Sequence, residues 1–328
     1  MRRKMHGEFM LIITALIWGV SFVAQRAGME YIGPFTFNGI RCLIGALVLL
    51  PVLTSMAHQR KKRQSAETEI KATEIELKTA RKDLIAGGLV CGVVFFISSS
   101  LQQIGMIYTT AGKAGFITAL YIVIVPILGI FLRQKVRPIL WLCVVLATTG
   151  LYLLCIQEDF LIGKGDLLIL ICAFGFSIHI LVIDHFSPKI DGVKLSCFQF
   201  LVCGILSIPC MIIFETIRWA DIINCWLPIL YAGVLSCGIA YTLQVVAQKY
   251  TEPTVTSLIL SMESVFAVIA GIIILNEQIS IRETFGCIIM FIAILLAQIP
   301  SKGKITNKLS EKHEEILNPY KYKGEDVR

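Results

Sequence analysis

Charged residues are scarce in this chain. Asp, Glu, Lys and Arg make up 16% of its 328 residues, whereas hydrophobic residues make up 56%, and the mean hydropathy is +0.76. So few charges cannot provide the polar surface that a water-soluble protein of this length carries. The composition therefore predicts a membrane protein.

Catalytic and nucleotide-binding motifs are also missing. The sequence contains no G-x-x-x-x-G-K-S/T phosphate-binding loop, and neither G-x-S-x-G nor H-E-x-x-H occurs. These motifs hold the phosphates of ATP, the nucleophile of many hydrolases and the zinc ion of many proteases. We therefore expect neither ATP hydrolysis nor membrane-embedded hydrolysis, and the sequence predicts a protein that is not an enzyme and has no cofactor.

The eleven cysteines include no C-x-x-C pair, and they lie in or next to apolar segments. Cysteine in such a setting is usually a small packing residue. We infer no disulfide framework and no metal site from them.

Apolar stretches of about 20 residues recur along the whole chain, and as helices they are long enough to cross a hydrocarbon core of roughly 30 Å. We interpret the first as a retained helix, because no convincing small-x-small cleavage site follows it. The fold class predicted is all-α and polytopic, with ten transmembrane helices. The predicted spans are 9–27, 35–55, 84–106, 114–132, 138–156, 165–184, 195–214, 226–247, 254–275 and 283–299.

The net charge of +7 follows the predicted topology. Of the 30 Lys and Arg residues, 24 lie in the two tails and in alternate loops on one side, and four lie in the loops of the other side. Basic loops stay in the cytoplasm, so we predict a plasma-membrane protein whose two termini are cytoplasmic. The basic charge thus indicates orientation in a lipid bilayer, and no nucleic-acid partner is expected.

Internal repetition divides the chain. LQQIGMIYT at 101–109 matches LQVVAQKYT at 243–251, and WGVSF at 18–22 is weakly echoed by FGFSI at 174–178. We predict two five-helix repeats, residues 7–156 and 163–299. Because five is odd, the halves cross the membrane in opposite senses and form an inverted repeat.

Two polar segments lie outside the spans. The basic segment 57–83 is predicted to be a cytoplasmic loop, part of it a short helix, that contacts anionic lipid headgroups. A regulatory role is the alternative. Residues 300–328 are predicted to be a polar cytoplasmic tail.

Within the fourth span, Pro126 predicts a kink or a break, because proline lacks the amide that the helix needs.

Three stretches carry a family resemblance: WGVSF, TTAGKAGFITALY at 109–121 and, most specifically, SLILSMESVFAVIAGIIILNE at 257–277. Over about residues 7 to 299 the chain resembles the EamA family of the drug/metabolite transporter (DMT) superfamily. The resemblance implies a ten-helix secondary transporter, usually an exporter of amino acids or other small metabolites, with a central cavity. It also implies that helices five and ten contact the other half or the other subunit of a homodimer.

The sequence departs from the family pattern at one position. Many relatives carry proline directly after the glutamate of the ninth helix, and this chain has Ser264 there. The resemblance therefore leaves a kink at this point in question.

Glu263 is a carboxylate within an almost wholly apolar run. Facing lipid, it would cost about 2.5 to 3.5 kcal/mol, so we expect it to face the interior of the bundle. Two interpretations stay open: a group that exchanges protons and couples their movement to transport, or a structural group that bonds its neighbours or pairs with Arg41. For Arg41 the alternatives are that pairing, a bidentate bond to a substrate carboxylate, and snorkelling to the membrane surface.

Amides, aromatic rings and small polar groups recur on shared faces of several predicted helices. One glutamine alone is more typical of a bond between helices, but the set predicts a cavity that binds solute through directional hydrogen bonds. His179 is either a member of a proton relay with Glu263 or a satisfied interior histidine. The cavity candidates besides Arg41 and Glu263 are Trp18, Gln25, Phe95, Ser99, Gln102, His179, Gln199, Tyr241, Gln244 and Ser261.

These patterns together predict a secondary transporter that moves a small-molecule solute by alternating access. The resemblance favours export, and a proton is the expected coupling ion if Glu263 titrates. An uncoupled facilitative exchanger is the alternative within transport. A membrane scaffold or sensor that recruits partners through the basic loop and tail is the alternative outside it.

Overall fold

The computed structural model describes residues 2–66, 74–134, 136–155, 163–275 and 280–297. Over these residues the secondary structure is helical, and no strand is described. Seven of the described helices are long and apolar enough to cross a membrane, which makes the chain a multi-pass membrane protein. The other three predicted spans coincide with shorter apolar helices, at Pro138–Gly150, Pro253–Ala267 and Thr284–Ala297.

The first part of the chain forms six helices. They are α1 (Arg2–Gly28), α2 (Pro34–Ala66), α3 (Glu74–Tyr108), α4 (Ala111–Ala119), α5 (Tyr121–Phe131) and α6 (Pro138–Cys155). The predicted loop at 57–83 differs from expectation, because α2 and α3 extend into it from both sides. This segment contains neither Gly nor Pro and is rich in Lys, Arg, Gln, Glu and Ala, which favour helix. The predicted tail, 300–328, lies outside the described residues.

The described residues of the second part form nine helical elements. They are α7 (Lys164–Phe186), α8 (Gly192–Phe214), α9 (Trp219–Asn224), α10 (Trp226–Leu230), η1 (Tyr231–Tyr241), α11 (Thr242–Gln248), α12 (Pro253–Leu260), α13 (Glu263–Leu275) and α14 (Ile281–Ala297). The element η1 is a π-helix of eleven residues, a rare form that is frequent at functional sites.

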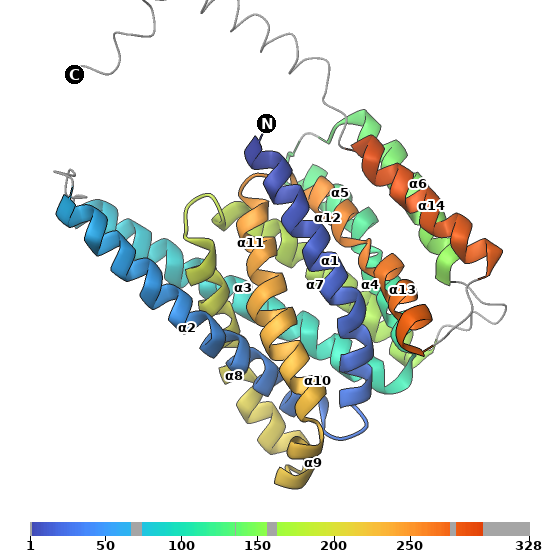
Figure 1. The fold of residues 1–328 in the computed structure, drawn as a ribbon, viewed down its shortest axis with the longest axis horizontal. Helices are drawn as coiled ribbons and strands as arrows, with labels where there is room; N and C mark the ends of the chain where they lie inside the picture. Colours follow the sequence, from blue (N-terminus) through green and yellow to red (C-terminus); the bar gives the residue numbers. More distant parts are fainter. Residues whose placement is uncertain (1, 67–73, 135, 156–162, 276–279, 298–328) are drawn as a thin grey trace, which may run out of the picture.

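The helices pack into one bundle, with α6 and α14 side by side at its edge (Figure 1). Helix α3 packs against α7 and α8, α2 packs against α8 and η1, and α1 packs against α13 and η1. The contact between α2 and η1 is close: a Cβ atom added at Gly45 would lie 2.6 Å from Cβ of Cys237. Small residues allow such an approach between membrane helices.

Two of the predicted spans are interrupted. Leu120 separates α4 from α5, and Ser261 and Met262 separate α12 from α13. At both points a backbone amide donates to the carbonyl three residues earlier, as in a 3₁₀-helix, and not four residues earlier. The amide of Val123 bonds the carbonyl of Leu120, and the amide of Met262 bonds the carbonyl of Ile259.

The two interruptions differ in their relation to proline. Pro126, which predicted a break, lies within α5 a few residues beyond the first interruption. The second interruption contains no proline. The helix is broken there although Ser264 occupies the position where the family resemblance implies proline. The hydroxyl of Ser261 donates to the carbonyl of Leu258 at 2.8 Å, which satisfies a backbone group at the end of α12.

Candidate functional site

A cavity opens between the two interruptions and the helices around them. Counted with its opening to solvent, the space between the lining residues is about 460 Å³. In the part of the chain that the structure describes, no group of three or more His, Cys, Asp or Glu residues could hold a metal ion. The lining residues are Trp18, Phe22, Gln25, Arg41, Gln102, Thr118, Tyr121, Phe176, His179, Ile180, Ser236, Tyr241, Gln244, Leu260 and Glu263.

Glu263 is the first residue of α13, and only 2% of it is exposed. Its Oε1 atom accepts a hydrogen bond of 2.8 Å from the hydroxyl of Tyr121, which is the first residue of α5. The two interrupted spans thus meet at this bond. Glu263 lies in the first turn of α13, at the partly positive end of the helix dipole, which favours a carboxylate.

Arg41 lies in the second turn of α2 and is 1% exposed. Its Nη1 atom donates to Oε1 of Gln25 at 2.7 Å, and its Nε atom donates to Oδ1 of Asn38 at 3.1 Å. The burial contradicts snorkelling to the membrane surface. Within the described residues no ion pair joins Arg41 to Glu263, which contradicts the pairing that was one alternative for both groups. The two charged groups occupy separate places on the cavity wall.

Eight of the twelve candidate residues line this cavity. They come from seven different elements, so the side chains converge from across the bundle although they are far apart in the sequence. The eight are Trp18, Gln25, Arg41, Gln102, His179, Tyr241, Gln244 and Glu263.

The other four candidates do not line the cavity. The ring of Phe95 lies behind the wall, with its centroid 4.8 Å from that of Tyr241. The hydroxyl of Ser99 accepts a bond from Asn38, the residue that also holds Arg41. Gln199 bonds Nε2 of His179 at 3.0 Å. Ser261 bonds the backbone of α12.

The hydrogen-bond partner of His179 does not support the predicted proton relay between His179 and Glu263. The described hydrogen bond of its ring goes to Gln199, and the described bond of Glu263 goes to Tyr121. Rings of Phe95, Phe176 and Tyr241 surround the imidazole. This environment is that of a satisfied interior histidine.

Sequence reasoning missed seven lining residues, of which Tyr121 carries the most chemistry. A signal for it was present. Gln102 and Gln244 occupy matching places in the internal repeat, and both line the cavity. Tyr121 and Glu263 are separated by 142 residues, the same offset as the two glutamines. Carrying the repeat forward by this offset would have paired Glu263 with Tyr121.

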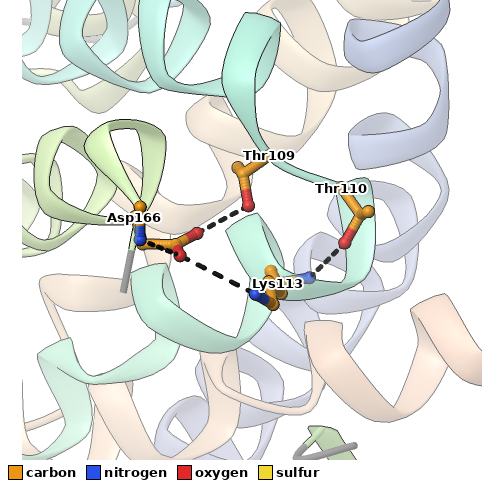
Figure 2. Close-up of polar contacts among 5 residues, drawn as sticks. Thr109, Thr110, Lys113 and Asp166 are labelled. Atoms are coloured by element: carbon orange, nitrogen blue, oxygen red, sulfur yellow. Dashed lines mark hydrogen bonds and ion pairs between the residues drawn. The ribbon is translucent and has the colours of Figure 1, made fainter. Parts of the chain in front are cut away.

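A second polar cluster lies outside the cavity, where α3 ends and α4 and α7 begin (Figure 2). Asp166 accepts a bond of 2.6 Å from the hydroxyl of Thr109, and its other oxygen lies 3.8 Å from Nζ of Lys113. The same oxygen accepts from the amide of Gly163 at 2.9 Å. The cluster therefore fastens the ends of three helices that also line the cavity.

The family whose model matches this chain, and two similar proteins, are named as transporters. The model of the EamA-like transporter family matches residues 5–156 and 163–298. An "Uncharacterized transporter" of Archaeoglobus fulgidus is 28% identical over 303 residues, covering 90% of this chain and 87% of the relative. The "Uncharacterized transporter YoaV" of Bacillus subtilis is 23% identical, covering 87% and 94%. A crystal structure of a protein with 15% identity matches the fold with a TM-score of 0.68, covering 89% of this chain and 96% of that one.

Proposed function

Because the chain belongs to the EamA-like transporter family, we propose that it is a secondary transporter that moves a small organic solute through the cavity by alternating access. The observation that carries the proposal is the bond between Tyr121 and Glu263, where two interrupted helices meet at the cavity wall. Interrupted helices at corresponding places in two halves are typical of the solute sites of secondary transporters.

The proposal includes ten crossing helices in two inverted halves, residues 7–156 and 163–299. Two separate matches to the family model support this division. The shared offset of the pairs Gln102 with Gln244 and Tyr121 with Glu263 supports it as well. In an inverted repeat a pseudo-two-fold axis relates equivalent residues of the two halves, so those that lie near the axis meet at the interface between the halves.

Glu263 is the proposed coupling group, and a proton is the proposed ion. The carboxylate faces a cavity, so a proton can reach it when the cavity opens. The hydroxyl of Tyr121 stabilises the ionised form by donating to it, and it can reorient when the carboxyl group is protonated. Each state of Glu263 thus keeps a hydrogen-bond partner, as an exchanging group requires.

The solute is proposed to be a metabolite such as an amino acid, because the cavity combines amides and aromatic rings with one group of each charge. The distribution of Lys and Arg supports a plasma-membrane location with both termini in the cytoplasm. Export is the proposed direction, on the resemblance to the family. A homodimer through α6 and α14 is also proposed, since this pair exposes Leu142, Val145 and Phe291 at the edge of the bundle.

The test compares metabolites outside cells that express the native chain with those outside cells that express Glu263→Gln at the same abundance in the membrane. We expect a metabolite that accumulates outside only with the native chain. Equal accumulation with both would favour an uncoupled facilitative exchanger. No accumulation with either chain, together with no uptake, would contradict the transport proposal.

A further inference from the structure

The guanidinium group of Arg41 is incompletely bonded. In the described part of the chain its Nη2 atom is buried and has no hydrogen-bond partner, whereas Nη1 and Nε are bonded to Gln25 and Asn38. Buried polar atoms nearly always have a partner, and an orphan on a charged group is especially costly. An unbonded guanidinium donor on a residue that lines the cavity therefore indicates an absent ligand.

Among the described residues no carboxylate forms an ion pair with Arg41. Its bonded partners are neutral amides, and the titratable groups nearest to it are the thiols of Cys42, Cys203 and Cys237 and the phenol of Tyr241. None of these groups is a carboxylate. An arginine stays protonated in proteins, so Arg41 is a buried cation that no described carboxylate contacts in an ion pair.

From these observations we infer that Arg41 binds the carboxylate group of the solute, an inference that rests on the proposed transport function. A carboxylate supplies both missing elements, a negative charge and an acceptor for Nη2. The bonds from Gln25 and Asn38 hold the guanidinium in a fixed orientation before the solute arrives, which lowers the entropy cost of binding.

Glu263 fixes the orientation of this solute. A carboxylate placed beside Glu263 would be repelled by it, whereas one placed at Arg41 is attracted. The rings of Trp18, Phe176 and Tyr241 line the same cavity and suit an apolar or aromatic body. Two other lining atoms, Nε1 of Trp18 and Oε1 of Gln244, are also buried without a partner among the described residues, and they can bond polar groups of the solute.

The test measures binding to the purified full-length protein by calorimetry. Each probe is a pair with the same body, one member a carboxylate and the other its neutral-headed amide: acetate and acetamide, 3-phenylpropanoate and 3-phenylpropanamide, and L-leucine and L-leucinamide. We expect the carboxylate to bind more tightly by about tenfold or more in at least one pair, which corresponds to the loss of a charged hydrogen bond. No preference for a carboxylate in any pair would overturn the inference.

Three variants identify the group responsible. Arg41→Gln should abolish the preference, and Arg41→Lys should keep it in weakened form, because lysine retains the charge without the planar fork. Arg26→Gln is the matched control, since Arg26 lies on α1 outside the cavity lining and should leave binding unchanged. If Arg41→Gln fails to fold, the inference is tested by Arg41→Lys together with the probe pairs measured on the native protein. A preference that is unaltered in a folded Arg41 variant would contradict the inference.

Flux into vesicles separates this inference from the transport proposal. Transport of a solute without a carboxylate, undiminished in Arg41→Lys, would overturn the carboxylate site and leave the transporter intact. Carboxylate binding through Arg41 without flux in either direction would support the site and contradict the transport proposal.

Discussion

Arg41 and Glu263 share one cavity, but the chain stabilises them in different ways. Arg41 lies within the uninterrupted helix α2 and is held by the amides of Gln25 and Asn38. Glu263 lies at an interruption, at the start of α13, and is held by the hydroxyl of Tyr121. Both are almost fully buried.

The difference indicates different tasks. The guanidinium is permanently charged and is held by two bonds, so it suits a fixed binding point. The carboxylate has one bond to a hydroxyl group that can both donate and accept, so it suits a group that changes its protonation state. We therefore assign, as proposals, solute binding to Arg41 and proton coupling to Glu263.

Among substitutions in the cavity lining, the largest expected effect on stability comes from removing the support of Arg41. Gln25→Leu takes away the acceptor for Nη1 and leaves the buried cation with one described bond. Unfolding of the purified protein should become easier by about 1.5 to 3 kcal/mol, the usual contribution of a hydrogen bond to a charged group. Denaturant unfolding measures this, with Gln103→Leu on α3 as the control, since Gln103 does not line the cavity. An unchanged stability would mean that Gln25 does not support the cation.

The second effect concerns Glu263. Tyr121→Phe removes the hydroxyl that bonds the carboxylate and should reduce flux by roughly five- to tenfold, equivalent to about 1 to 1.4 kcal/mol. The control is Tyr231→Phe, which removes the hydroxyl that bonds the carbonyl of Ile17. An equal loss of flux in both variants would show that the bond to Glu263 has no particular role.

A smaller effect is expected at the interruption itself. Ser264→Pro introduces the proline that the family resemblance implies after Glu263. The position lies in the first turn of α13, where proline is tolerated, and the change removes the bond of 3.2 Å from the Ser264 amide to the carbonyl of Ser261. We expect a change in stability below about 1 kcal/mol and retained flux. Ile269→Pro, in the interior of α13, is the comparison and should cost about 3 kcal/mol. A similar cost at both positions would contradict the assigned start of α13.

The smallest effect is expected outside the cavity. Lys113→Ala removes the ion pair with Asp166, whose atoms lie 3.8 Å apart near the ends of α3, α4 and α7. A partly exposed pair contributes about 0 to 1 kcal/mol, so stability and the preference for carboxylates should both change little. A large loss of carboxylate binding would indicate that Lys113, and not Arg41, binds the carboxylate of the solute.

Hydropathy alone could predict most of the membrane-spanning segments, because each is a long apolar run. It could also place Glu263 and Arg41 inside the bundle, since charged groups in such runs avoid lipid. It could not exclude an ion pair between them, because pairing depends on how the helices rotate and which amides lie within reach. Gln25 and Asn38 satisfy part of Arg41 in the structure, and Tyr121 bonds Glu263.

Local features set by contacts between helices were harder to predict. The interruption at Ser261 and Met262 contains no proline or glycine, so no local pattern indicates it. The π-helix η1 has the same kind of apolar sequence as an ordinary span. The extension of α2 and α3 into the basic segment was predictable, because helix-favouring residues without Gly or Pro fill that segment.

The coupling role of Glu263 is tested by measuring how many protons the purified protein moves with each solute molecule in sealed vesicles. The native chain and Glu263→Gln are compared with the same solute and the same amount of reconstituted protein. We expect a fixed proton-to-solute ratio for the native chain and no proton movement for Glu263→Gln. The same nonzero ratio in both would contradict the role assigned to Glu263.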